Sequence, residues 1–155
     1  MQVAKKNTPK ELGLVGEMTG IDLAKLKKTL EGAIPVIVPI GVSEEGSFYN
    51  VNADDVACYL AAQLKAEKLI LLTRVLGVMR NLQDETTLLP TILVKEAEDL
   101  IKDKVIVEGV VPKVRAAVKA VQAGVSKAHI VDAKIPHGIL LEIFTDEGIG
   151  TEIVE

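Results

Sequence analysis

Residues 49–73 read YNVNADDVACYLAAQLKAEKLILLT and combine a polar cluster, a helix pattern and a buried-strand pattern. After the polar cluster, apolar residues recur at the spacing of one helical face, at positions 53, 56, 57, 60, 61 and 64. This spacing predicts a helix over 53–64. The run KLILLT at 68–73 is typical of a strand buried on both faces of a sheet. A helix that leads directly into such a strand favours an α/β fold.

The remainder of the chain alternates between the same two patterns. Further helices are expected over 21–30, 94–104, 111–123 and 136–145, and further strands over 34–40, 127–133 and 148–155. Residues 1–12 are polar and rich in lysine, which predicts a flexible or weakly held start. Glu98 and Lys102 have the spacing of an i,i+4 ion pair on a helix. The alternation predicts a mostly parallel sheet with helices on both faces.

Composition and charge exclude several classes of protein. The chain has 155 residues, about the size of one domain, and 48% of them are hydrophobic but only 3% aromatic. The net charge of −4 argues against a general nucleic-acid binder, which carries a basic face. No apolar run approaches the roughly 20 residues of a membrane span, and the first residues lack an apolar signal core. Cys58 is the only cysteine, which excludes an intrachain disulfide. We therefore expect a cytoplasmic protein without nucleic-acid or membrane partners.

The polar cluster of the opening stretch lies at a junction between a strand and a helix. It consists of Asn50, Asn52, Asp54 and Asp55. Helix capping explains one or two of these residues, because Asn and Asp are preferred at the N-cap and acids suit the first turn. In open α/β sheets, ligands bind in loops that follow the carboxyl ends of strands and lead into helices. The cluster therefore indicates a ligand site, with capping alone as the alternative.

A second junction, EGVVPKV at 108–114, has the features of a phosphate site. Gly109 allows the backbone to approach a ligand closely, and Pro112 suits the first turn of a helix. Lys113 then falls in that first turn, where the helix macrodipole disfavours a cation. A lysine beside the unpaired N–H groups of a helix N-terminus indicates a phosphate site. Considered alone, Lys113 is better explained as a solvated surface lysine.

Other candidate residues carry weaker signals. In LLTRVLGV at 71–78, Thr73 and Gly77 mark the end of a strand and a loop of the kind that holds nucleotides. His129 and His137 are too isolated to indicate a metal site or a catalytic pair. Both are expected to be structural, with His129 semi-buried on a strand.

Five segments can be read together: LGLVGEMTGID, IPVIVPIGVSEEGSFYNVNADDVA, LKAEKLILLT, EGVVPKV and PHGILLEIFTDEGIGTEIV. Together they resemble the acetylglutamate kinases of the amino acid kinase family. The match runs in order from Leu12 to the C-terminus, and NVNAD together with the lysine after GVVP is specific. The resemblance implies an α/β fold, a three-layer αβα sandwich with a mostly parallel sheet. Residues 1–155 would form a single domain that contains the nucleotide-binding lobe and part of the substrate lobe.

The same resemblance implies a reaction and roles for single residues. The reaction is ATP-dependent phosphorylation of the γ-carboxylate of N-acetyl-L-glutamate in arginine synthesis, with Mg²⁺ held through the ATP phosphates. Asn50 corresponds to the asparagine that binds acetylglutamate, and Asp54 to the aspartate that organises the catalytic lysines. Lys113 corresponds to the lysine that neutralises the transferred phosphoryl group and binds the nucleotide. The nucleotide-side loops of the family are matched at Thr73, Gly77 and Gly109.

The chain also departs from the family pattern. The family sequence TDVPG is replaced by TRVLG at 73–77, so Arg74 stands near the nucleotide in place of an acid. This arginine would attract phosphates or crowd the ribose. The family's N-terminal phosphate loop is rich in glycine, whereas this chain has no Gly-Gly dipeptide.

We therefore expect a kinase-like protein that is incomplete as an isolated chain. A non-catalytic nucleotide-binding or regulatory module, or one half of a split kinase, is the alternative. The expected partners are ATP or ADP, acetylglutamate, and either further copies of the chain or a separate N-terminal half.

Overall fold

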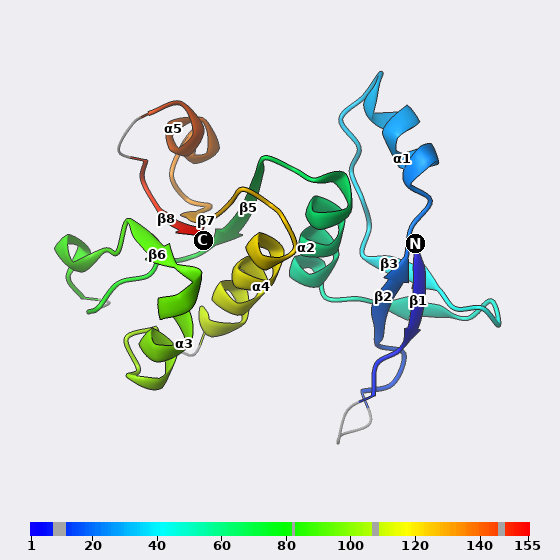
Figure 1. Ribbon diagram of the computed structural model, residues 1–155, viewed down its shortest axis with the longest axis horizontal. Coiled ribbons are helices and arrows are strands. Elements are labelled where there is room, and N and C mark those ends of the chain that lie inside the picture. Colours follow the sequence, from blue (N-terminus) through cyan, green and yellow to red (C-terminus); the bar gives the residue numbers. More distant parts are fainter. Residues whose placement is uncertain (8–11, 82, 107–108, 146–147) are drawn as a thin grey trace. The chain divides into compact units, whose positions relative to one another are not determined.

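The computed structural model describes residues 1–7, 12–81, 83–106, 109–145 and 148–155 (Figure 1). The chain divides into two compact units, Met1–Leu64 and Lys65–Glu155. Each unit has its own mixed β-sheet and its own helices, which confirms the α/β class. Among the described ranges, no helix is long and apolar enough to cross a membrane.

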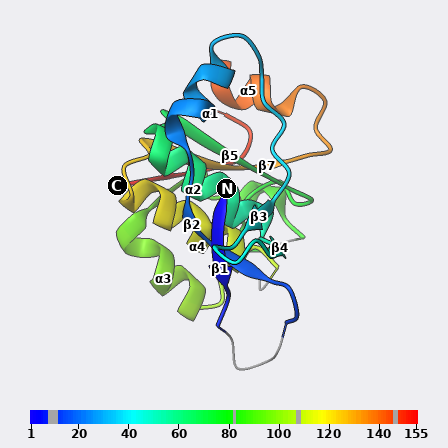
Figure 2. The same cartoon turned by 90° about the vertical axis from the view of Figure 1, so that its right-hand side faces the viewer.

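The first unit is built on a sheet with the strand order β2-β1-β3-β4 (Figure 2). Its elements are β1 (Gln2–Lys5), β2 (Gly16–Gly20), α1 (Leu23–Leu30), β3 (Ile40–Val42), β4 (Phe48–Asn50) and α2 (Ala53–Leu64). Strand β1 runs antiparallel to β2 and parallel to β3, and β3 runs antiparallel to β4. One core cluster of buried residues in this unit consists of Val3, Val51, Val56 and Leu60. Val56 and Leu60 are one helical turn apart, so the predicted apolar face of α2 supplies half of this core.

Two expectations for the first unit are wrong. Residues 1–12 do not begin as a flexible segment, because β1 lies inside the sheet and Val3 is buried. The strand expected over 34–40 is also absent from the described structure, where Ile34 and Val36 are both 95% exposed and β3 begins only at Ile40. Proline has no N–H to donate to a strand ladder, and this segment has prolines at 35 and 39. Pairing therefore starts directly after the second proline.

The second unit has a sheet with the strand order β5-β7-β8-β6. Its elements are β5 (Lys68–Thr73), a 3₁₀ turn (Glu85–Thr87), β6 (Thr91–Leu93), α3 (Val94–Lys102), α4 (Val111–Gln122), β7 (Lys127–Asp132), α5 (Gly138–Phe144) and β8 (Thr151–Val154). Strands β5 and β7 are parallel, as are β6 and β8, whereas β7 and β8 are antiparallel. The predicted strand at 68–73 and the predicted helices of this unit are confirmed to within a few residues.

Helix α4 packs against β5, β7 and β8. Its contact face is made of Val114, Ala117, Ala120 and Val121, all of which are buried. Ile130, Val131 and Ile153 of the sheet are fully buried. The small alanine side chains let the helix lie close to these larger aliphatic residues, as dense packing requires. This packing fixes the N-terminus of α4 relative to the ends of the strands.

The ion pair expected between Glu98 and Lys102 is not observed in the described structure, and each side chain has a different partner. The Glu98 carboxylate instead accepts hydrogen bonds from Arg115 of α4, with Oε1 3.0 Å from Nε. Lys102 pairs with Asp99, at 3.0 Å between Nζ and Oδ1. A bidentate arginine on the neighbouring helix offers a carboxylate better geometry than a lysine one turn away.

Candidate nucleotide and substrate sites

A cavity of about 470 Å³ lies in the second unit, beyond the end of β5 and beside the first turn of α4. It is lined by Leu72, Thr73, Arg74, Val75, Gly109, Val110, Lys113 and Ala133. Four of these residues were singled out from the sequence as nucleotide-side residues, namely Thr73, Arg74, Gly109 and Lys113. They come from separate stretches of the chain, and the fold brings them to one cavity.

The parallel pairing of β5 and β7 brings the end of β5 and the loop after β7 to this cavity. Thr73 pairs with Asp132, so the two strands end at the same level. The N–H of Ala133 donates to the carbonyl of Thr73 at 2.8 Å, which ties the loop after β7 to the end of β5. The cavity therefore lies beyond the carboxyl ends of parallel strands, the usual ligand position in an α/β sheet.

The N-terminus of α4 contributes a positive electrostatic environment. The N-cap residue, Val110, gives no side-chain cap, the first turn contains no acidic residue, and Pro112 lies in that turn as predicted. The first helical hydrogen bond runs from the Val114 N–H to the Val110 carbonyl, at 3.0 Å. Backbone N–H groups ahead of this bond have no intrahelical acceptor, and the macrodipole places partial positive charge there. The half-buried side chain of Lys113 adds a full charge.

This lining fits a nucleotide. Arg74, Lys113 and the Thr73 hydroxyl suit phosphate groups, whereas Leu72 and Val75 offer apolar surface to a base or ribose. The described lining residues include no carboxylate. Over the described ranges, no cluster of three or more His, Cys, Asp or Glu side chains is arranged to hold a metal ion. Glu108, which begins the predicted phosphate junction, lies outside the described residues.

Gly77 occupies a different place from the other nucleotide-side candidates. A Cβ atom at this position would lie 2.6 Å from Oγ1 of Thr151 and 2.9 Å from Cδ1 of Leu88. The neighbouring Val78 N–H donates to the same Thr151 hydroxyl at 2.8 Å. The close approach to β8 thus explains why glycine is needed here, and a contact between Gly77 and a nucleotide stays a prediction.

The polar cluster of the first unit is divided between structural tasks and candidate ligand contacts. Oδ1 of Asn52 accepts hydrogen bonds from the N–H groups of Asp54 and Asp55, at 2.8 and 3.1 Å, and so caps α2. Asp55 also forms an ion pair with Lys6, at 3.7 Å. Capping and pairing thus account for Asn52 and Asp55, the two members to which the resemblance assigns no role. Asn50 ends β4 and is exposed, and Asp54 lies half-buried in the first turn of α2.

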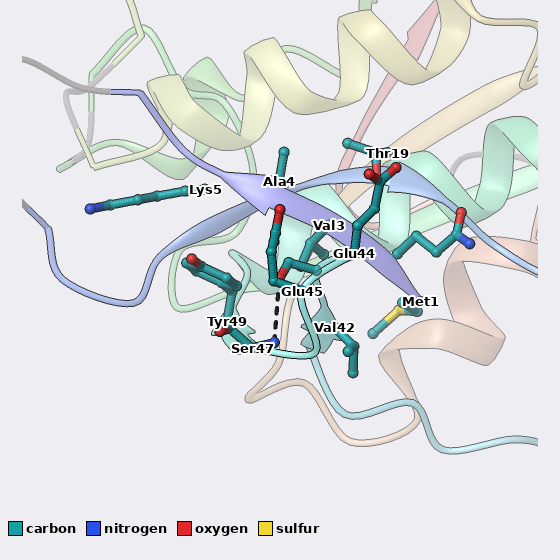
Figure 3. A pocket seen from close by; sticks show the side chains of 12 residues that line it. Met1, Val3, Ala4, Lys5, Thr19, Val42, Glu44, Glu45, Ser47 and Tyr49 are labelled. Carbon is teal, nitrogen blue, oxygen red and sulfur yellow. Dashed lines mark hydrogen bonds between the residues drawn. The ribbon is translucent and has the colours of Figure 1, made fainter.

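The first unit also contains a cavity that the sequence did not reveal (Figure 3). It encloses about 960 Å³ along β1 and the loop that joins β3 to β4, and Lys5, Glu44 and Tyr49 are among its lining residues. Successive side chains of a strand point to opposite faces, so Tyr49 lines this cavity while Asn50 faces away from it. The cavity escaped prediction because it depends on β1, which the sequence presents as a loose start.

A buried ionisable pair holds the C-terminal part of the second unit together. Nδ1 of His129 and Oε1 of Glu142 lie 2.7 Å apart, and both side chains are buried. Oε2 of Glu142 accepts the N–H groups of Ile149 and Gly150, at 2.7 and 2.9 Å. Burial raises the pKa of Glu142, whereas the hydrogen bonds from Ile149, His129 and Gly150 lower it. The hydrogen bonds together have the larger effect, so the pKa of Glu142 lies below the usual value. His129 is thus a structural histidine, more deeply buried than its sequence suggested.

Comparison with known sequences identifies relatives over nearly the whole chain. The model of the Amino acid kinase family matches residues 2–132. The acetylglutamate kinase of Desulforamulus reducens is 47% identical over 149 residues, which are 96% of this chain and 52% of the relative. The acetylglutamate kinase of Syntrophobacter fumaroxidans is 49% identical over 93% of this chain and 48% of the relative. The resemblance seen in the sequence is thus confirmed, and the chain spans about half the length of the curated relatives it matches.

Solved structures with the same fold include proteins of different names. N-acetylglutamate synthase from Neisseria gonorrhoeae, in complex with coenzyme A and L-arginine, gives a TM-score of 0.88 at 28% identity and is matched by 99% of this chain, over 36% of its own length. Carbamate kinase from Giardia lamblia, bound to AMP-PNP, gives a TM-score of 0.67 at 23% identity, over 90% of this chain and 46% of its own. At that identity the second match shows the fold alone. From the family match and the shared fold together, we conclude that this chain belongs to the amino acid kinase family.

Proposed function

We propose that the chain is the nucleotide-binding lobe and part of the substrate lobe of an acetylglutamate kinase-like protein. The observation that carries this proposal is the cavity of the second unit, which collects Thr73, Arg74, Gly109 and Lys113 at the N-terminus of α4. The relatives at 47% and 49% identity are named acetylglutamate kinase, and the reaction we propose is phosphorylation of the γ-carboxylate of N-acetyl-L-glutamate by ATP. Mg²⁺ would accompany the phosphates.

The proposed roles follow from charge and position. Phosphoryl transfer depends mainly on positioning and on neutralising the charge of the transferred group. Lys113, beside the partial positive charge of the α4 N-terminus, would neutralise that group. Asn50 would bind the acetylglutamate, and Asp54 would orient lysines whose flexible stems otherwise leave their ammonium groups poorly placed.

The isolated chain is proposed to bind nucleotide without turning over substrate at a normal rate. It spans about half of its relatives, so other groups that face the transferred phosphoryl would be supplied from elsewhere. Loss of one preorganised donor alone costs about 10²–10³ in rate. An assay of acetylglutamate-dependent ADP release should therefore give a signal far below ordinary kinase rates of about 1–100 s⁻¹. A rate within that range would show that the chain is a complete kinase.

A non-catalytic nucleotide-binding or regulatory module is the second candidate. The fold match to a protein named N-acetylglutamate synthase favours it, because the same fold can serve a protein that is not named a kinase. The two candidates predict different kinase activities after a second segment is added to the chain. Addition of a segment that corresponds to the first half of a relative should restore kinase activity only if the chain is half of a kinase.

Calorimetry with ADP in Mg²⁺ buffer tests the nucleotide site itself. We expect weak binding by the wild type and at least about tenfold weaker binding by Lys113→Ala, since a hydrogen bond to a charged group contributes about 1.5–3 kcal/mol. Lys119→Ala is the matched control, because Lys119 lies on the same helix but in its last turn. Equal affinities of the wild type and Lys113→Ala would show that Lys113 is only a surface lysine.

A further inference from the structure

We propose that residues 34–40 form an antiparallel β-ribbon with the same residues of a second copy, so that the chain pairs with itself as a symmetric dimer. The segment reads IPVIVPI, which is the same sequence in both directions about Ile37. An antiparallel pair centred on Ile37 therefore sets identical residue types opposite each other. A two-fold interface between identical chains requires this self-complementarity. The inference is independent of the nucleotide site.

The segment is open to a partner. It runs between the end of α1 and the start of β3, and no strand pairs with residues 34–38 in the described structure (Figure 1). Ile34, Val36 and Val38 are exposed, and such alternate positions lie on one face of a strand. The N–H groups of the two valines form no hydrogen bond with a described residue. The Val38 carbonyl accepts the Ile40 N–H at 2.8 Å and keeps a second lone pair for another donor. Unpaired donors beside apolar side chains are typical of an edge that pairs with another strand.

The positions of the prolines agree with a ribbon centred on Ile37. Hydrogen-bonded and non-hydrogen-bonded residue pairs alternate along an antiparallel ladder. With Ile37 facing its counterpart in a non-hydrogen-bonded pair, Pro35 and Pro39 also fall in non-hydrogen-bonded pairs, where no N–H is needed. Val36 and Val38 then fall in hydrogen-bonded pairs, and each exchanges N–H and C=O bonds with the partner copy. The segment thus has donors at the positions where the ribbon uses them.

The sheet of the first unit leaves the required edge open. The Pro39 carbonyl accepts the Val51 N–H at 2.9 Å, so the edge that carries the prolines is turned toward the end of β4. Neighbouring residues of an extended chain direct their N–H groups to opposite edges, so the two valines face the other edge. On that edge β1 begins to pair only at Gln2, beside Val42. A strand from a second copy would occupy the position in line with β1.

The charges at the two ends of the segment are complementary. The last turn of α1 carries Lys27 and Lys28, and the loop between β3 and β4 carries Glu44 and Glu45. All four side chains are exposed, and none forms an ion pair within the described part of the chain. Lys28 precedes Ile37 by nine residues and Glu45 follows it by eight, so antiparallel pairing brings the lysines of each copy toward the glutamates of the other. Complementary charges of this kind favour encounter and fix the register.

Disulfide trapping tests the register. The Cα atoms of a non-hydrogen-bonded antiparallel pair lie about 4.5 Å apart, which is within the range of a disulfide. Ile37→Cys should therefore form a disulfide-linked dimer under mild oxidation, because each copy places its cysteine opposite that of the other. Ile34→Cys is the control, since this position is more exposed but the ribbon places its two copies at opposite ends. It should remain monomeric on a non-reducing gel. The wild type gives the background from the buried Cys58.

Charge reversal tests the pairing of the ends. One variant combines Lys27→Glu with Lys28→Glu, and a second combines Glu44→Lys with Glu45→Lys. Each variant alone sets like charges against each other at both ends of the ribbon, so its dimer should be at least about tenfold weaker than that of the wild type in sedimentation. An equal mixture should form a heterodimer of wild-type affinity, because opposite charges meet again at both ends. Circular dichroism checks that each variant is folded.

Each outcome counts for or against the dimer. A dimeric wild type, selective crosslinking of Ile37→Cys and recovery in the mixture would support it. A wild type that sediments as a monomer at micromolar concentration, equal crosslinking of the two cysteine variants, or a mixture that associates no better than its components would overturn it. If a segment that corresponds to the first half of a relative binds the wild type and disperses the dimer, that segment is the occupant of the edge and the proposal also falls.

Discussion

Gly77 and Gly109 differ in what surrounds them, although both lie in stretches that the sequence marks as nucleotide loops. A Cβ at Gly77 would press on Thr151 at 2.6 Å, whereas a Cβ at Gly109 would meet no atom of the described residues within 4 Å, its chain neighbours aside. Thr151, which leaves no room for a side chain at Gly77, lies 74 residues further along the chain. No local sequence pattern indicates that contact. The sequence therefore identified the glycine but could not separate a packing role from a ligand role.

Substitution of these glycines should separate stability from binding. Gly77→Ala should lower the free energy of unfolding of the second unit by about 1–3 kcal/mol, because the added methyl overpacks the contact with β8. Gly109→Ala should leave stability almost unchanged, because the added methyl would contact no described residue. It should weaken ADP binding, because Gly109 lines the cavity and the methyl would take up space that the ligand needs. Amide hydrogen exchange of β7 and β8 measures the first effect. Equal protection in the two variants would contradict the contact with Thr151.

Glu142 should make the second unit sensitive to acid. Its pKa in the folded chain is lowered from 4.5, so its ionised form is favoured by folding. The resulting stability is present above the unfolded-state pKa and is lost as the pH falls through the folded-state pKa. Glu142→Gln should therefore be less stable than the wild type at neutral pH, by about 1–3 kcal/mol for the weakened hydrogen bonds. Denaturant unfolding across a pH series should show this gap closing as the pH falls below the usual range of a glutamate. Parallel curves for the two proteins would contradict it.

At the scale of helices and strands, periodic patterns predicted an element reliably where the residues within that element determine its conformation. The α2 helix and the β5 strand have the predicted bounds because a one-sided apolar face and a short apolar run each permit one arrangement. The run at 34–40 is equally apolar, but its prolines remove strand donors and only its last residue enters β3. Strand β1 was missed because Val3 alone of its residues is buried. Likewise, the partner of Glu98 is Arg115 on α4, and a contact between two helices cannot be predicted from spacing within one helix.

The N-terminus of α2 offers a test at this scale. Asn52→Ala removes the acceptor for two N–H groups and should destabilise the first unit by about 1 kcal/mol. Asp55→Ala is the comparison, since its ion pair with Lys6 is exposed and such pairs contribute only about 0–1 kcal/mol. Both tyrosines of the chain, Tyr49 and Tyr59, belong to this unit, so tyrosine fluorescence during denaturation reports on it alone. A larger loss in Asp55→Ala than in Asn52→Ala would contradict the assignment of Asn52 as the cap.

At the scale of the whole chain, unpaired strand edges predict association. Strands β5 and β6 lie at the edges of one sheet and β2 and β4 at the edges of the other, within the described structure. Exposed apolar side chains at Ile34, Val36 and Phe48 add surface that a monomer rarely leaves open. We expect a homodimer or a higher oligomer in sedimentation at micromolar concentration, or binding to a separate N-terminal half. A chain that sediments as a monomer and also fails to bind such a half would contradict this expectation.

Amide NMR shifts of the isotope-labelled chain, followed during titration with ADP, locate the nucleotide without any mutation. The shifts should move at Thr73, Arg74, Gly109 and Lys113, which line one cavity in the second unit. Residues around Tyr49 in the first unit and around His129 in the second line other cavities and should stay unchanged. Shifts centred on either of those cavities, or no shifts at any ADP concentration, would contradict a nucleotide site at the N-terminus of α4.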